Sequence, residues 1–176
     1  MVQAKFGPID QIGIIVDDID QALQSWMGNL GIGPWTLFRG AGVSGHCRGE
    51  PTDVTFDVAM GYQGQVQIEL MQITNHAPSP YRGGDGKLLL GMHHIAWVVE
   101  DLDAAMATAS DGGMKLVFRA GNPGTEVAYF EMDEQPGMMF EFIQSQITRE
   151  LMDSGIAATR TWDGSDPITV IDFTAK

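Results

Sequence analysis

The sequence predicts an α+β fold built from two copies of a β-α-β-β-β module. The main observation is an internal repeat: a shift of 83 positions aligns residues 9–23 (IDQIGIIVDDIDQAL) with residues 92–106 (MHHIAWVVEDLDAAM). A second match, at an offset of 72, joins residues 65–72 (QVQIELMQ) to residues 137–144 (GMMFEFIQ). The length of 176 residues suits one compact domain, or two half-domains that share a core.

Each module is expected to begin with a strand followed by a helix. An apolar, β-branched run ends at an acidic pair in both copies, which indicates a strand. Asp18 and Asp101 then stand where an N-cap side chain accepts hydrogen bonds from the first free amides of a helix. The helical segments DQALQSWMGNL and DAAMATASDGG both run into glycine, which is a common stop signal.

Three further strands complete each module. Residues 52–60 (TDVTFDVAM) and 125–132 (TEVAYFEM) precede the second match, and GYQGQ and DEQPG are compatible with hairpin turns between them. Another strand fits GPWTLFRG in the first module and MKLVFRA in the second. Because the offset falls from 83 to 72, the first module carries 11 extra residues, which we place around GAGVSGHCRGE.

The repeat also sets the expected domain boundaries. The first module covers residues 1–76, a linker rich in glycine and proline covers 77–90, and the second module covers 91–145. A C-terminal helix and tail occupy 146–176, with a short helix over 146–154 and a possible last strand at TVIDF.

Composition and charge favour a globular protein that acts on small molecules. Hydrophobic residues make up 44% of the chain and charged residues 19%, with a net charge of -13. No stretch gathers Lys and Arg, so nucleic acid and anionic membranes are poor partners. The negative charge also disfavours binding of coenzyme A, which carries several phosphate groups. This would change only if four scattered basic residues converged in space: Lys5, Arg39, Arg48 and Arg119.

The sequence also suggests a cytoplasmic protein. The N-terminus lacks the apolar run of a secretory signal, and no window approaches the length of a membrane span. The single cysteine, Cys47, cannot form an internal disulfide. It lies in the polar, glycine-rich stretch over 40–49, where a bystander thiol is favoured over a nucleophile because no motif surrounds it.

Four residues at repeat-related positions are candidate metal ligands. Gln11 and His94 lie near the start of the first strand of each module, and Glu69 and Glu141 lie in the middle of the last. A single Gln or His in a strand is more often an ordinary side chain. A glutamate inside the apolar segments IELM or FEFI is less easily explained as an ordinary side chain, because burying an unpaired carboxylate costs several kcal/mol. One imidazole, two carboxylates and one amide oxygen suit a divalent first-row metal with open water positions.

The other histidines are not expected to bind the metal. His93 should point to the opposite face of its strand from His94, because side chains alternate along a strand. His46 and His76 lie in loop-like stretches without a partner at ligand spacing, and we expect both to be exposed.

The segments DQIGIIVDDIDQAL, QIELMQ, MHHIAWVVEDLDAAM and MFEFIQ together resemble the vicinal oxygen chelate superfamily, which has the glyoxalase-like fold. This resemblance covers residues 9–144 and implies a cupped, eight-stranded mixed sheet with a divalent metal at its centre. The linker and second module are most similar to the glyoxalase I and methylmalonyl-CoA epimerase branch. The epimerase pattern has His first and Gln second, so Gln11 and Glu69 depart from it, and the set Gln, Glu, His, Glu resembles glyoxalase I.

The resemblance implies an isomerase or epimerase that moves a proton next to a metal-bound carbonyl through an enolate intermediate. Glu141 is the first choice for the base and Glu69 its partner, while Asp57 is either an assisting acid or an exposed surface residue. The metal would be Zn, Ni, Co, Mn or Mg, and the substrate a small carbonyl compound. A glyoxalase I-type lyase and a non-catalytic ligand-binding protein are the alternatives. A homodimer is expected, because repeated modules can pack within or between chains.

Overall fold

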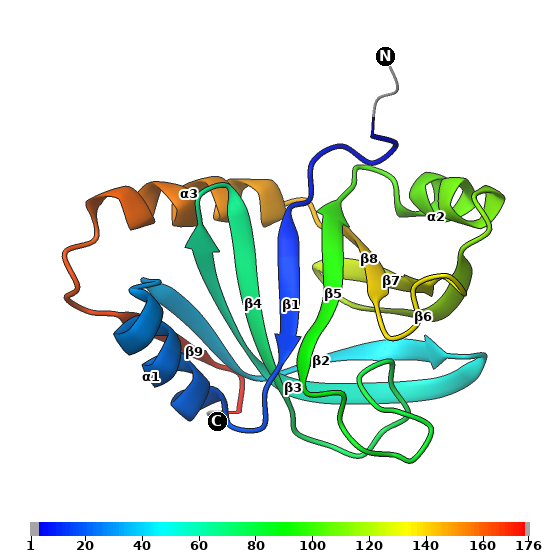
Figure 1. Cartoon of the computed structure of the whole chain (residues 1–176), viewed down its shortest axis with the longest axis horizontal. Coiled ribbons are helices and arrows are strands. Elements are labelled where there is room, and N and C mark those ends of the chain that lie inside the picture. Colours follow the sequence, from blue (N-terminus) through cyan, green and yellow to red (C-terminus); the bar gives the residue numbers. More distant parts are fainter. Residues whose placement is uncertain (1–3, 175–176) are drawn as a thin grey trace.

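The computed structural model describes residues 4–174; residues 1–3 and 175–176, the ends of the expected first module and tail, lie outside the described residues. Two modules and a C-terminal segment follow one another along the chain (Figure 1). The first module comprises β1 (Gln11–Ile15), α1 (Ile19–Leu30), β2 (Trp35–Cys47), β3 (Glu50–Gln63) and β4 (Val66–Ile73). The second comprises β5 (Gly91–Val98), α2 (Leu102–Asp111), β6 (Lys115–Asn122), β7 (Thr125–Glu131) and β8 (Met139–Gln144). The C-terminal segment consists of α3 (Thr148–Thr161) and β9 (Ile168–Asp172).

The strands form one strongly curved sheet with the order β3-β4-β1-β5-β8-β7-β6-β2-β9. The modules meet where β1 pairs antiparallel with β5, and each of these strands pairs in parallel with the last strand of its own module. Because β2 pairs with both β3 and β6, the eight module strands close on themselves. The predicted eight-stranded mixed sheet of paired modules is therefore confirmed, and β9 adds a ninth strand beside β2.

The two repeated helix starts are built alike. Asp18 accepts a hydrogen bond from the Gln21 backbone N–H at 2.9 Å, and Asp101 accepts one from Ala104 at the same distance. The repeated glutamines at the ends of β4 and β8 also take part: the side-chain oxygens of Gln72 and Gln144 accept hydrogen bonds from the first backbone amides of α1 and α2. These bonds satisfy amide groups that a helix leaves without partners, and they tie each helix to the last strand of its module.

The extra residues of the first module lengthen a hairpin rather than form a loop. Strands β2 and β3 have 13 and 14 residues, whereas β6 and β7 have 8 and 7. His46 therefore lies in a strand, not in a loop, although its side chain is exposed as expected. Cys47 is buried in the same strand, and burial raises the pKa of its thiol. A buried thiol with a raised pKa is a poor nucleophile.

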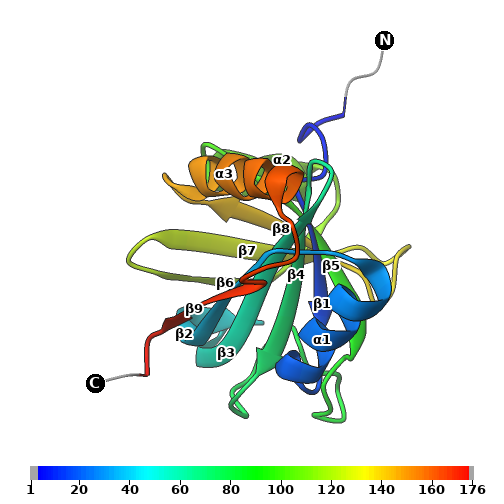
Figure 2. The same cartoon turned by 90° about the vertical axis from the view of Figure 1, so that its left-hand side faces the viewer.

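Helices α1 and α2 cover the convex side of the sheet, and a separate group of apolar residues lines the inside of the curve. Ile19 and Leu23 of α1 pack on β2, β3 and β4, and Leu102 and Ala105 of α2 pack on β7 and β8. Helix α3 crosses the end of the curved sheet and joins β9 (Figure 2). Within the described residues, no helix is long and apolar enough to cross a membrane.

Candidate metal site and cavity

The four candidate ligands come from the four central strands of the sheet, β4, β1, β5 and β8. The strand register explains why they share one face. Gly13 of β1 is paired with both Glu69 and His94. In the same way, Ala96 of β5 is paired with both Gln11 and Glu141. Directly paired residues point to the same side of a sheet, so two small residues at the junction of the modules are flanked by four polar ones. These four are Gln11, Glu69, His94 and Glu141.

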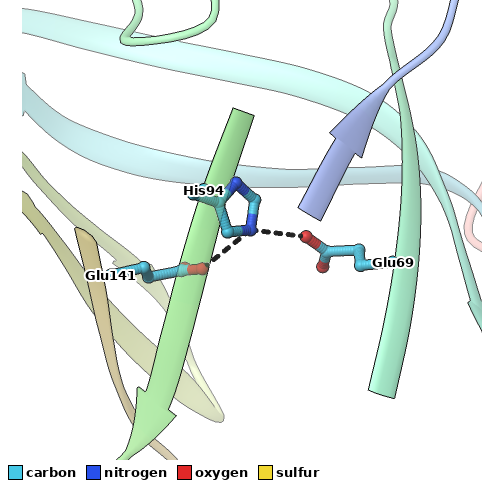
Figure 3. Close-up of side chains that lie close together, drawn as sticks. All are labelled: Glu69, His94 and Glu141. Atoms are coloured by element: carbon cyan, nitrogen blue, oxygen red, sulfur yellow. Dashed lines mark ion pairs between the residues drawn. The ribbon is translucent and has the colours of Figure 1, made fainter. Parts of the chain in front are cut away.

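Gly13 makes room for the His94 imidazole. A Cβ atom at this position would lie 1.8 Å from Cε1 of His94 and 2.0 Å from Nε2, well inside van der Waals contact. The ring therefore lies over the glycine, and its Nε2 faces the two carboxylates (Figure 3).

Glu69, His94 and Glu141 form a compact buried cluster. Nε2 of His94 lies 3.2 Å from Oε2 of Glu69 and 3.1 Å from Oε2 of Glu141 (Figure 3). The potential ligand atoms all lie within 4.8 Å of one another. None of the three side chains is more than 9% exposed. Two carboxylates therefore share one imidazole in a space that water barely reaches.

Each of the four candidate ligands carries a buried polar atom without a hydrogen-bond partner. These atoms are Oε1 of Gln11, Oε2 of Glu69, Nε2 of His94 and Oε2 of Glu141. The contacts around Nε2 lie within ion-pair distance but lack the alignment of hydrogen bonds. Buried polar atoms are normally paired, so four convergent exceptions indicate a missing ligand. Adjacent ligands of an octahedral ion at about 2.1 Å lie about 3.0 Å apart, close to the observed spacing. The donor set therefore fits a divalent cation.

A hydrogen-bond chain orients the amide of Gln11. Its Nε2 donates to Oε1 of Gln67 at 2.7 Å, and Nε2 of Gln67 donates to the hydroxyl of Tyr62 at 2.8 Å. Because the amide nitrogen is occupied, the oxygen of Gln11 is left for the cluster. An amide oxygen is the atom a metal would bind.

His93 contacts His94, contrary to the expectation that the two point to opposite faces. The pairing of β5 with β1 shifts register here: Gly13 pairs with His94 but Ile14 pairs with Met92, so His93 is an extra residue in a β-bulge. Nδ1 of His93 lies 3.0 Å from Nδ1 of His94. Burial, followed by the charge of His94, lowers the pKa of His93 to about 4, so this side chain is neutral at pH 7.

Glu141 has a raised pKa. Burial is the largest cause, while the positive charge of His94 and hydrogen bonding to Tyr129 act in the opposite direction. Tyr129 is the residue paired with Glu141 across β7 and β8, and its hydroxyl also accepts a hydrogen bond from Tyr81 at 3.1 Å. Tyr81 comes from the linker between the modules and is buried. Two tyrosine hydroxyls are thus held next to this carboxyl group.

The cluster lies at the buried end of a cavity of about 350 Å³. Its polar lining at that end consists of Gln11, Gln67, Glu69, Glu141, Tyr81 and Tyr129. The strands contribute a mostly apolar wall that includes Phe38, Val43, Phe56, Val58, Met60, Met71, Val127 and Ile143, together with the polar residues Asn122 and Thr125. The outer end is lined by Ile147, by Thr148 and Leu151 of α3, and by Phe173, which follows β9. Sequence reasoning missed this contribution, because nothing in the tail resembles either module.

Asp57 does not belong to this cavity. Its neighbours Phe56 and Val58 line the cavity, so Asp57 points to the other side of β3. There its carboxylate accepts hydrogen bonds from the Arg39 side chain at 2.7 Å and from the Gly40 backbone at 2.8 Å. Asp57 therefore holds the β2–β3 hairpin together and is not placed to assist as an acid.

Comparison with known proteins agrees with this fold. A family model described as the Glyoxalase/Bleomycin resistance protein/Dioxygenase superfamily matches residues 10–129. The chain therefore belongs to this superfamily, as its resemblance to the vicinal oxygen chelate proteins implied. None of the curated proteins matches the sequence.

Solved structures with the same fold include a methylmalonyl-CoA epimerase from Mycobacterium tuberculosis. It is 17% identical, with a TM-score of 0.55, and the match covers 86% of this chain and 96% of the epimerase. A hypothetical protein from Bacillus halodurans is 22% identical, with a TM-score of 0.51, and the match covers 79% of this chain and 94% of that protein.

Proposed function

We propose that this protein is a divalent-metal-dependent isomerase or epimerase that moves a proton next to the carbonyl group of a small-molecule substrate. The observation that carries the proposal is the set of four buried, unpartnered polar atoms at the inner end of a mostly apolar cavity. A protein that only sequesters apolar compounds has no use for two buried glutamates, because their burial is costly. The epimerase among the structures of the same fold is consistent with this reaction class.

The residues proposed to hold the metal are Gln11, Glu69, His94 and Glu141. A bound divalent ion would act as a Lewis acid on the carbonyl oxygen of the substrate and so acidify the neighbouring C–H group. The two carboxylates would balance the charge of the ion.

Glu141 is the proposed base, with Glu69 as its partner. Both carboxylates line the cavity, so a bound substrate can reach them. In the metal-free protein burial raises the pKa of Glu141, and the same apolar surroundings favour the neutral carboxyl group that forms when Glu141 takes up a proton. The proton taken from the substrate is held on the carboxyl group before it is returned to carbon, and exchange of this carboxyl proton with solvent is what deuterium uptake reports. Return of the proton by Glu141 to another atom gives isomerisation, whereas epimerisation requires the partner Glu69 to deliver a proton to the opposite face.

Metal analysis combined with hydrogen exchange tests this proposal. Protein purified without chelator is expected to hold about one divalent ion per chain, which elemental analysis measures. The metal is then removed and returned while ¹H NMR follows deuterium uptake from D₂O into ketones and methylmalonyl-CoA, and a separate assay follows conversion of the methylglyoxal–glutathione adduct. We expect exchange only with metal present. A protein that takes up no metal when divalent ions are supplied would instead be a ligand-binding protein.

Replacing the base separates metal binding from proton transfer. Glu141→Gln keeps the shape and an oxygen donor but removes the basic group, so we expect at least a 100-fold loss of exchange, about the contribution of general base catalysis. The fold, measured by circular dichroism, should be unchanged. Full exchange activity in this variant would reject Glu141 as the base and leave Glu69 to be tested by the same substitution.

A further inference from the structure

Building on the proposed function, we propose that the substrate is an uncharged, largely apolar carbonyl compound, enclosed by the C-terminal segment α3–β9, and not a coenzyme A thioester. The inference rests on the chemistry of the cavity wall, on the positions of the basic residues and on the way α3 and β9 complete the wall.

The cavity offers no positive side chain to an anionic substrate. No lysine or arginine among residues 4–174 lines it. Apart from the polar cluster at the inner end, the strand residues in the wall are aliphatic or aromatic except for Asn122 and Thr125, which are uncharged. The proposed metal does not change this balance, because the carboxylates of Glu69 and Glu141 neutralise a divalent charge. An anionic group inside the cavity would lose its hydration without gaining a partner.

The four basic residues considered above as a binding site for coenzyme A do not lie close together. Arg39 pairs with Asp20 and Asp57 on the convex side, and Arg48 pairs with Glu131. Arg119 pairs with Asp103 and Glu126, and Lys5 is exposed near the end of α2. The net charge of -13 adds a general repulsion for phosphorylated ligands. The sequence was compatible with coenzyme A only if these basic residues converged in space, and they do not.

The C-terminal segment supplies the outer wall of the cavity. Ile147, Thr148 and Leu151, at the start of α3, line the cavity together with Phe173. The ring of Phe173 stacks on Phe38 of β2, with 6.3 Å between centroids and 11° between planes. Ile147, Leu151 and Phe173 are 56%, 53% and 63% exposed, so large apolar surfaces frame the outer end. Such surfaces favour a ligand that is apolar along its whole length.

This wall is firmly attached at both ends. At the start of α3, the Arg149 guanidinium donates to both carboxylate oxygens of Asp10 and to the Val98 carbonyl oxygen, which fixes the helix to β1 and β5. Further along α3, Gly155 lies against the Tyr62 ring of β3 so closely that a Cβ there would be 2.0 Å from it. β9 then pairs in parallel with β2 over Trp35–Arg39. The segment α3–β9 is therefore a fixed part of the cavity wall.

A matched pair of ketones tests the inference. 1-Tetralone is uncharged and apolar and has exchangeable protons next to its carbonyl group, and 6-carboxy-1-tetralone differs by one carboxylate. Binding to the metal-loaded protein is measured by calorimetry, and deuterium uptake by NMR. We expect 1-tetralone to bind at least about 100-fold more tightly, because the carboxylate would be buried without a partner.

Two variants of α3 locate the effect. Leu151→Arg adds a positive charge to the cavity wall, and we expect it to raise the affinity for the carboxylated ketone, relative to 1-tetralone, by about fivefold. Ala157→Arg adds the same charge to an exposed position of the same helix outside the lining, and the ratio should be unchanged.

Binding and exchange separate this inference from the proposed function. Tight binding of 1-tetralone without metal-dependent exchange in any carbonyl compound would contradict the proposed function but support the ligand class. Equal or tighter binding of 6-carboxy-1-tetralone or methylmalonyl-CoA would overturn the ligand class, even where exchange occurs. Failure of 1-tetralone and of related uncharged ketones to bind at millimolar concentration would overturn it as well.

Discussion

The proton positions on His93 and His94 follow from one acceptor, the carbonyl oxygen of Pro80. This oxygen lies 2.9 Å from Nε2 of His93 and can only accept, so Nε2 carries the proton. Neutral His93 then has a lone pair on Nδ1, which accepts from Nδ1–H of His94. Nε2 of His94 is thereby directed at the carboxylates as the atom that binds either a proton or a metal ion. Outer hydrogen bonds of this kind set the orientation and basicity of metal ligands.

Removing this outer hydrogen bond should weaken metal binding without removing a ligand. We expect His93→Phe to lower the metal affinity by about 10- to 100-fold, measured by competition with a chelating dye. His76→Phe, at an exposed histidine outside the cluster, is the control. An unchanged affinity in a correctly folded His93→Phe protein would show that the Pro80–His93–His94 chain does not set the ligand.

Gly13 tests whether the imidazole needs the space above it. Gly13→Ala would place a methyl group within 2.0 Å of the His94 ring, so the ring must move away from the carboxylates. We expect weaker metal binding and a loss of about 1–3 kcal/mol in the free energy of unfolding, measured by titration and urea denaturation. Gly28→Ala in α1 meets nothing within 4 Å and should be neutral or stabilising. Full metal affinity in Gly13→Ala would contradict the packing argument.

The repeated Glu-x-x-Gln motif of β4 and β8 has two separate roles. Glu69 and Glu141 face the cavity, whereas Gln72 and Gln144, three residues further along each strand, point to the convex side and cap the helices. An odd spacing places the two side chains on opposite faces of a strand. One short motif thus contributes to the site and attaches a helix on the other side of the sheet.

The cap can be tested with substitutions that differ only in hydrogen-bonding capacity. Gln144→Leu leaves the Leu102 backbone N–H without its partner, and we expect a loss of about 1–3 kcal/mol in the free energy of unfolding. Gln144→Glu keeps an acceptor oxygen and places a negative charge at a helix N-terminus, so most of the stability should return. Urea denaturation measures both. Equal losses in the two variants would mean that the hydrogen bond contributes nothing.

The sequence was sufficient for those features that recur within it. The repeat located both modules, both helix caps and the four residues that surround Gly13 and Ala96 in the sheet. The β-bulge at His93 was not predictable, because it is a mismatch between two strands and leaves no mark in either one alone. The lengthened β2–β3 hairpin was mistaken for a glycine-rich loop. The role of α3 and β9 was also missed, since it depends on where the chain returns after the second module.

The free energy of folding and the affinity for a metal ion are coupled through His94. In the metal-free protein, burial lowers the pKa of His94, but the nearby charges of Glu141 and then Glu69 outweigh burial and raise it to about 9. A raised folded-state pKa stabilises the folded protein fully below the unfolded value of about 6.5. This contribution is lost as the pH rises through about 9.

Stabilisation of the folded protein by a bound metal ion should increase with pH, because the proton and the metal compete for the Nε2 atom of His94. Metal binding at pH 6 must displace this proton, whereas at pH 9 half of the molecules have already lost it. We therefore expect the rise in melting temperature on adding a fixed Zn²⁺ or Ni²⁺ concentration to increase between pH 6 and pH 9. Calorimetry in buffers of different ionisation enthalpy should show about one proton released per ion at pH 6. His94→Gln should abolish both effects, and a metal-induced shift that is constant with pH would show that His94 is not a ligand.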